Sequence, residues 1–370
     1  MIHSLFSEDG SLEGLASLID EAGRTGCDRG LVVLGGIGNE FDRPAATAYF
    51  RARTQPLAGG LFPAIVFDRR VHPTGWVVYG FERAPRLTVI EQVSDLDRNP
   101  IDCDGEAADL DETCMVLVDG HANRLSTFLN AVFADEAGST RYIGGGAGSL
   151  ESNQHPCIIS NRGLLRDAAV IVRTGVRAGV GVSHGWHAAS TTMRATATAG
   201  NTLCQIDFKP AFEVYRDLVE SFHGHSVDPD NMLASASMYP IGIRRLGGSV
   251  IVRDPIAVTA AGEIVCVGEF DKDCFVHLLT SNHAALLRSA EEANRQADED
   301  LAGHAGQKVI FDCVSRYLLL KEDFVEEIRL LSDGDVVTSG ALSLGEVASD
   351  GRGFLEFCNK TTAVALFSGA

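Results

Sequence analysis

Apolar and polar positions along the chain change between a helical period and runs typical of strands, which predicts an α/β architecture. Behind Ser11, a good helix-capping residue, apolar side chains recur at intervals of three and four: Leu12, Leu15, Leu18 and Ile19. This spacing predicts an opening helix, and the apolar run at 30–34 then predicts a buried strand. A second helix is expected over 42–53, followed by two β-rich runs at 62–67 and 76–81.

The order of strand, helix, glycine turn and hairpin recurs three times along the chain. Each strand and its glycine turn are marked by one pair of residues: Val32 and Gly59, Val116 and Gly144, Ile310 and Gly340. The separations within these pairs are 27, 28 and 30 residues. Because the copies are too far apart and too unevenly spaced for a solenoid, we expect a supersecondary unit duplicated within two lobes. The predicted fold class is mixed α/β (α+β).

A change of lobe is expected near residues 226–231, because this segment is rich in turn-forming residues and has no apolar period. The predicted domains are therefore 1–225 and 226–370. The second domain is expected to open with two strands and to continue into a long helix over 282–301. We interpret the charged face of that helix as solvated surface.

Charge and composition narrow the function classes. The 370 residues include 50 acidic and 31 basic side chains, a net charge of −19, which would repel nucleic acid and anionic lipid. No run reaches 18 apolar residues, and residues 1–10 lack the features of a signal peptide. The nine cysteines are scattered, and we expect them to be reduced, buried thiols. A cytoplasmic protein without nucleic-acid or membrane partners is expected.

One motif is typical of serine hydrolases. Residues 181–185 read Gly-Val-Ser-His-Gly and match the nucleophile-elbow pattern around Ser183. The elbow requires a following helix, whereas the β-branched run 190–198 predicts a strand. We therefore assign no catalytic residue, and a hydrolase using Ser183 or Cys313 stays an alternative.

A glycine cluster and several histidines are further candidates for a binding site. The cluster Gly144, Gly145, Gly146 and Gly148 suits either a tight turn or a loop facing a ligand. The histidines with suggestive positions lack cysteine or carboxylate partners at zinc-ligand spacing: His184, His187, His223 and His225. We therefore assign no metal site from the sequence.

Near the C-terminus, a predicted strand runs into a helix at residues 312–316. Ligands of open α/β sheets collect at such strand ends, so Cys313 and Arg316 are pocket candidates. A structural arginine beside a small buried residue is the alternative. Glu346 after a glycine turn and Asn359 after a short strand are candidate polar anchors.

Six short runs together resemble the FIST family, whose paired modules take their name from F-box and intracellular signal transduction proteins. They occur in the family's order and extend over nearly the whole chain: 117–120, 144–148, 183–186, 252–255, 311–316, and 345–346 with 357–361. The resemblance implies a FIST N-terminal domain at 1–225 and a FIST C-terminal domain at 226–370. It also implies a sensor for a small ligand, an amino acid or a gas, rather than an enzyme.

The resemblance further implies how such a sensor works. With no output domain in this sequence, the signal is expected to pass to a separate protein such as a histidine kinase or a cyclase, and a homodimer is an option. We expect Arg316 to bind a ligand carboxylate and Glu346 an amino group, in a pocket that also includes Trp186, Cys313, Asn359 and the glycine cluster. One branch of the family senses nitric oxide through haem. His184 best corresponds to the iron ligand, so haem is an alternative cofactor.

Overall fold

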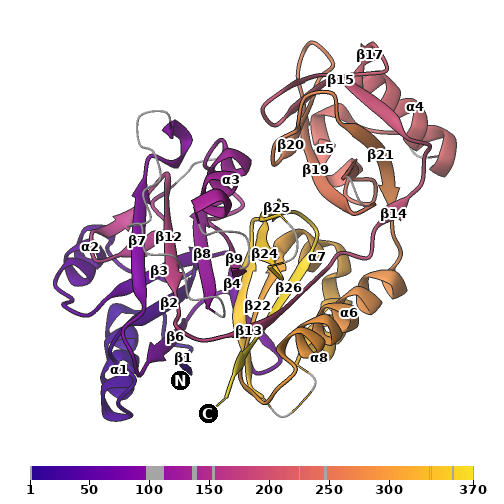
Figure 1. Cartoon of the computed structure of the whole chain (residues 1–370). Coiled ribbons are helices and arrows are strands. Elements are labelled where there is room, and N and C mark those ends of the chain that lie inside the picture. The colour runs from indigo at the N-terminus through magenta and orange to yellow at the C-terminus, as the bar shows by residue number, and fades with distance from the viewer. Residues whose placement is uncertain are drawn as a thin grey trace.

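A large body of three sheets and a smaller β-barrel make up the molecule. The computed structural model describes residues 2–96, 112–135, 140–151, 155–224, 226–245, 248–332, 334, 336–351 and 354–369. Figure 1 shows the barrel beside the body, joined to it near β14 and the start of α6. In the described part of the chain, no helix is long and apolar enough to cross a membrane.

Three units of the same design form the body. The first comprises β1 (Ile2–Ser7), α1 (Leu12–Arg24), β2 (Leu31–Gly36), α2 (Arg43–Arg51), β3 (Leu57–Phe62), β4 (Ala64–Phe67), β5 (Arg70–His72) and β6 (Trp76–Phe81). The second comprises β7 (Arg86–Glu91), β8 (Thr113–Asp119), α3 (Leu125–Asp135), β9 (Arg141–Ala147), β10 (Ile158–Ser160), β11 (Gly163–Leu165) and β12 (Ala168–Arg173). The third comprises β13 (Ala178–Ser183), α6 (His283–Leu301), β22 (Ala305–Cys313), α7 (Val314–Leu320), α8 (Phe324–Leu331), β23 (Thr338–Ser343), β24 (Glu346–Ser349), β25 (Glu356–Cys358) and β26 (Thr362–Ser368).

Each sheet is built on one parallel pair, and each is completed by a hairpin from another unit. The parallel pairs are β2 with β3, β8 with β9, and β22 with β23. The β4–β5 hairpin of the first unit adds to β23 of the third, β10–β11 of the second adds to β3 of the first, and β24–β25 of the third adds to β9 of the second. The three units are therefore joined in a cycle around a shared core, in which Phe62 and Phe311 pack with ring centroids 5.7 Å apart.

The predicted unit of strand, helix, glycine position and hairpin is confirmed, with two differences in detail. Gly59, Gly144 and Gly340 lie inside strands β3, β9 and β23 rather than in turns. At all three, a Cβ would overlap the carbonyl oxygen of the residue paired with it on the parallel neighbour. Glycine is needed at these positions because the backbones of the two parallel strands approach closely. In the sequence alone, a glycine with this role cannot be distinguished from a glycine in a turn. In the third copy, the one helix predicted between strand and glycine is two helices, α7 and α8.

The barrel is inserted into the third unit between β13 and α6. It contains β14 (His187–Ala188), β15 (Met193–Ala199), β16 (Thr202–Ile206), β17 (Lys209–Pro210), α4 (Ala211–His223), α5 (Met232–Ser235), β18 (Ile241–Arg244), β19 (Val250–Val258), β20 (Ile264–Val267) and β21 (Phe275–Thr280). Six strands pair in the order β15, β16, β20, β19, β18, β21, and β21 pairs β15 to close the ring. A closed ring leaves no unpaired edge.

The positions of the three units and the barrel can be compared with the two lobes expected from the sequence. The three copies of the unit lie in one body, and the second body is the inserted barrel. Strands β15 and β16 precede residue 225, whereas β18 to β21 follow it, and all of them belong to the same barrel. The division into domains at 225 and 226 stays a prediction.

Short 3-10 turns complete the described elements: 93–95, 229–231 and 321–323. The charged helix expected over 282–301 is α6, and Asn282 caps it by accepting a hydrogen bond from the Ala285 backbone N–H at 2.9 Å. Similarly, Ser11 caps α1 through the Gly14 N–H at 3.0 Å. These caps satisfy N–H groups that have no partner within the helix.

Candidate functional site

A crevice of about 640 Å³ lies between the barrel and the body. On the body side it is lined by residues just after the ends of β8, β9 and β22: 120–125, 149–151 and 314–315. On the barrel side it is lined by β19 and by residues 266–269. The carboxyl ends of strands in open α/β sheets are where ligands collect, and this volume suits a small organic molecule.

Three large apolar side chains that line the crevice are exposed to solvent. Leu150, Leu233 and Ile256 all line it and are 56%, 46% and 38% exposed. The three residues come from different segments: the loop after β9, helix α5 and strand β19. Large exposed apolar side chains that converge on one cavity are typical of a binding site for a partly apolar molecule.

One carboxylate in the wall of the crevice lacks a full set of partners. Asp254 of β19 is 2% exposed, and its Oδ2 accepts a hydrogen bond from Ser315 Oγ at 2.9 Å. Lys360 Nζ lies 3.1 Å from the same oxygen. Among the residues that the structure describes, Asp254 Oδ1 has no hydrogen-bond partner. An unsatisfied buried oxygen is costly, so this atom is suited to a donor from a ligand.

Neighbouring contacts fix β19 against the body. The Arg253 side chain donates to the Phe357 carbonyl oxygen at 2.9 Å and to the Glu269 carbonyl oxygen at 2.8 Å. The Glu269 carboxylate in turn accepts from the Ser126 backbone N–H, in the first turn of α3, at 3.2 Å. Barrel and body are therefore connected by specific polar contacts around the crevice, in addition to the two covalent connections near β14 and the start of α6.

Most of the residues expected to line a pocket meet instead in a buried polar cluster beneath the crevice. Its centre is the segment 359–361. Trp186 Nε1 donates to the Lys360 carbonyl oxygen at 3.3 Å, and the Lys360 ammonium lies 5.5 Å from the centre of the Trp186 ring. The Cys313 backbone N–H donates to the Thr361 carbonyl oxygen at 3.1 Å. The fold thus brings together residues from β22, from the loop between β25 and β26, and from the segment between β13 and β14.

Arg316 organises one side of this cluster. It is 0% exposed, and its guanidinium donates to Glu327 Oε1 at 2.7 Å, to the His184 carbonyl oxygen at 3.0 Å and to the Leu286 carbonyl oxygen at 2.9 Å. Asp312 Oδ1 lies 3.4 Å from its Nε. Because protein groups already occupy these donors, the geometry gives Arg316 a positioning role and does not support its contact with a ligand carboxylate.

Glu346 and Asn359 are equally buried. Glu346 is 0% exposed and accepts hydrogen bonds from Ser343 Oγ at 2.8 Å and the Thr361 N–H at 3.2 Å. Burial raises the pKa of Glu346 to about 8, which favours the protonated acid near neutral pH. Asn359 is 1% exposed, and its Oδ1 has no partner among the described residues. Both side chains act as internal polar groups in this structure.

The glycine cluster lies in and just after β9. Gly145 packs against Ser343 and Phe311, and a Cβ at Gly146 would lie 3.0 Å from the Gly120 Cα, so these residues permit close packing between strands. Gly148 has a φ of 130°, and a Cβ there would lie 3.0 Å from Leu344 and 3.1 Å from His121, two residues of the crevice. Of the four candidate glycines, Gly146 and Gly148 are thus the two that lie next to residues of the crevice wall.

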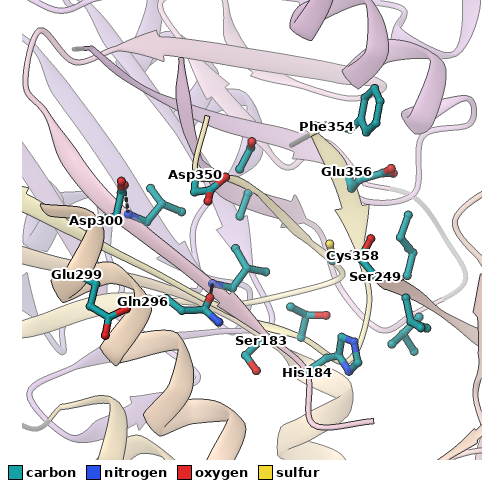
Figure 2. A pocket seen from close by; sticks show the side chains of 18 residues that line it. Ser183, His184, Ser249, Gln296, Glu299, Asp300, Asp350, Phe354, Glu356 and Cys358 are labelled. Carbon is teal, nitrogen blue, oxygen red and sulfur yellow. Dashed lines mark hydrogen bonds between the residues drawn. The ribbon is translucent and has the colours of Figure 1, made fainter. Parts of the chain in front are cut away.

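His184 lies in a second pocket of about 510 Å³, the His184 pocket, which is lined by the first residues of β19, whereas the crevice is lined by residues further along that strand. Figure 2 shows it beside Ser249 and Cys358, with Gln296 and Asp300 of α6 across from it. The two α6 side chains accept hydrogen bonds from the Val182 and Val180 backbone N–H groups at 3.0 and 3.1 Å. Burial and the Arg316 charge lower the pKa of His184 to about 4, so the ring is neutral at pH 7.

These residues do not fit haem ligation. His184 Nδ1 accepts a hydrogen bond from the Trp186 backbone N–H at 2.9 Å, so this ring nitrogen already has a partner within the protein. The described lining of the pocket includes four carboxylates and no lysine or arginine to pair with haem propionates: Glu299, Asp300, Asp350 and Glu356.

The nucleophile candidates lack the geometry that catalysis needs. Ser183 ends β13 and is followed by the short strand β14, so the strand-to-helix turn of a nucleophile elbow is missing at this point. Cys313 is 2% exposed, and burial and the Glu346 charge raise the pKa of its thiol well above the ordinary value. A protonated, enclosed thiol is a poor nucleophile.

Asp254, Ser315 and Lys360 were not among the residues expected from the sequence to bind a ligand. All three lie in family-like runs, 252–255, 311–316 and 357–361. The signal was therefore present, but nothing in a linear sequence says that these runs meet. Their pairing depends on β19 of the barrel reaching the loop between β25 and β26.

Two domains of one known family match most of the chain. The FIST N domain matches residues 31–209 and the FIST C domain matches residues 211–349. Both domains line the crevice, since 120–125 and 149–151 fall in the first match and Asp254 and Ser315 fall in the second. A search of curated proteins found no match. The chain therefore belongs to the FIST family, whose paired domains are small-ligand-binding sensory domains of signal transduction.

Proposed function

We propose that this protein is a small-ligand sensor, that its ligand binds in the crevice between barrel and body, and that it acts through a separate output protein. The observation that carries the proposal is Asp254 Oδ1, a buried carboxylate oxygen without a partner among the described residues, in the wall of a crevice lined by both FIST domains. A bound ligand would complete the hydrogen bonding of this oxygen.

The lining indicates the chemistry of the ligand. A hydrogen-bond donor would meet Asp254 Oδ1, and an apolar portion would cover Leu150, Leu233 and Ile256. The burial of these apolar side chains would supply much of the binding free energy, at about 25 cal/mol per Å². Amino acids with apolar side chains have such a donor and such a portion, whereas a diatomic gas would leave most of the 640 Å³ empty.

The position of the crevice supports a route for the signal. A ligand that touches both walls alters the balance of contacts between barrel and body, such as Arg253 with Phe357 and Glu269 with Ser126. A ligand shifts a conformational equilibrium only through different affinities for its two states. The output partner, a histidine kinase or a cyclase, would bind one barrel orientation in preference to the other.

A thermal-shift screen of amino acids and related amines tests the ligand site. A hit at a concentration of 100 times Kd stabilises the folded protein by about 2.7 kcal/mol, which raises the Tm measurably. Leu150→Glu puts a charge in the crevice at a residue that is 56% exposed, and should weaken binding of the hit at least about tenfold. Val325→Glu changes a 68% exposed residue outside the crevice lining and serves as the matched control.

Two results would count against the proposal. One is a hit whose Kd, measured by calorimetry, is the same in Leu150→Glu and in the native protein. The other is a hit whose affinity falls equally in Leu150→Glu and Val325→Glu, because a general effect of added charge would then explain the loss.

A further inference from the structure

Three potential metal ligands lie close together at the β1 edge of the first unit, and none of them lines the crevice. They are His3 of β1, Cys27 in the turn after α1, and Glu82 just after β6. One potential ligand atom from each residue lies within 4.8 Å of the other two. Cys27 is buried, whereas His3 and Glu82 are exposed, so a cation would reach the cluster from solvent.

Strand pairing explains why His3 and Glu82 are close. β1 and β6 are antiparallel, with His3 directly opposite Gly80 and Ile2 opposite Phe81. Residues two apart on a strand share a face, so Glu82 follows Gly80 on the face of His3. His3 and Glu82 are then diagonal neighbours, a relationship in which long side chains can reach one another.

Gly80 makes the space for the third ligand. A Cβ at this position would overlap the Cys27 carbonyl oxygen and would lie 3.2 Å from the Cys27 Cβ. The Cys27 backbone is fixed there, because its N–H donates to the Ala22 carbonyl oxygen at the end of α1 at 2.9 Å. Two residues on, the Arg29 N–H donates to the Phe81 carbonyl oxygen at 3.0 Å. Cys27 is therefore held against the sheet, and its thiol donates a hydrogen bond to the Thr25 carbonyl oxygen at 3.8 Å.

We propose that His3, Cys27 and Glu82 bind one zinc ion, with water as the fourth ligand. An imidazole, a thiolate and a carboxylate form a donor set that zinc accepts in tetrahedral geometry, whereas calcium and magnesium prefer oxygen ligands alone. On binding, the Cys27 thiol loses its proton to solvent and the resulting thiolate bonds the metal. The ion would connect the edge strand β1 to the turn after α1 and to the end of β6.

Cobalt substitution tests the donor set directly. Protein stripped with EDTA is titrated with Co²⁺, and one equivalent should give tetrahedral visible bands with a thiolate-to-cobalt band in the near ultraviolet. Zn²⁺ should then displace the cobalt and abolish both. The near-ultraviolet band should be lost in Cys27→Ser and kept in Cys204→Ser, which removes a half-buried cysteine of the barrel.

Variants at the exposed ligands His3 and Glu82 provide a second test, which still decides the question if Cys27→Ser does not fold. His3→Ala and Glu82→Gln change exposed side chains, and each should weaken zinc binding at least about tenfold in competition with a chromophoric chelator. Folding of each variant is checked by circular dichroism. Unchanged zinc affinity in both folded variants, or a cobalt spectrum without a thiolate band in the native protein, would overturn the proposal.

Discussion

Asp254 and Lys360 form a buried ion pair between the barrel and the body, with Oδ2 and Nζ 3.1 Å apart. Both side chains are at most 3% exposed, so water does little to screen the two charges. The pair joins β19 to the loop between β25 and β26, and Asp254 is the member of the pair that lines the crevice. It connects the proposed ligand site to the buried cluster around 359–361.

Removal of Lys360 should therefore be strongly destabilising. Lys360→Met leaves Asp254 as an uncompensated buried charge and should lower the free energy of unfolding by about 3–5 kcal/mol, measured in urea. The double variant Asp254→Asn with Lys360→Met carries neither charge and should recover much of that loss. Equal losses in the single and double variants would mean that lost packing, rather than an unpaired charge, causes the effect.

Stability should depend on pH through Glu346. Its pKa is raised from 4.5 to about 8, so the folded protein holds the proton more tightly than the unfolded chain does. The resulting stabilisation is complete below about pH 4.5 and is lost as the pH rises to about 8, with a slope of up to about 1.4 kcal/mol per pH unit. Glu346→Gln lacks this proton equilibrium and should show a flatter profile.

Urea unfolding at several pH values between about 5 and 8 measures the difference between the two profiles. Glu291→Gln, at an exposed position of α6, is the control and should follow the native profile. Parallel profiles for the native protein and Glu346→Gln would contradict the prediction.

The glycines shared by the three units should be intolerant of any side chain. A Cβ at Gly144 would overlap the Val116 carbonyl oxygen in the parallel strand. Gly144→Ala should therefore cost about 3 kcal/mol or more in unfolding free energy. Gly175→Ala, where a Cβ would have open space but φ is 63°, should cost only about 1–2 kcal/mol. A loss at Gly144 no larger than that at Gly175 would mean that the two parallel strands move apart enough to accommodate the methyl group.

The spectrum of the purified protein tests the haem alternative. We expect no Soret band that depends on His184, since its Nδ1 already accepts a hydrogen bond from the protein and the pocket lining is acidic. Protein expressed with a haem precursor and His184→Ala, purified in the same way, give the comparison. A strong Soret band that disappears in His184→Ala would reverse this conclusion and make a gas the favoured ligand.

Local pattern was enough to predict much of the body. Helix α1 follows from its apolar spacing and the Ser11 cap, and the repeated unit follows from strand, helix and glycine in the same order. The barrel did not follow, because its closure depends on pairs such as β16 with β20 and β15 with β21, which are distant in sequence. Periodicity describes one strand and does not identify its neighbours.

For the candidate site too, some features could be predicted from the sequence and others could not. Cys313 and Arg316 were expected at a strand end, and they lie there, but their burial results from contacts with α6, α8 and the segment 359–361. Asp254 looks like any strand residue until the barrel is placed against the body. The zinc ligands His3, Cys27 and Glu82 have no recognisable spacing, because a strand register and one glycine bring them together.

The cyclic exchange of hairpins has a consequence for synthesis of the chain. The β4–β5 hairpin emerges early, yet its partner β23 is made only after the second unit, the barrel and α6. The sheet of the second unit likewise waits for β24, close to the end of the chain. Until then, strand edges of both early units are exposed to other nascent chains. A chain truncated after the barrel would lack β23 and β24, so the β4–β5 hairpin and the outer edge of β9 would have no partner strand.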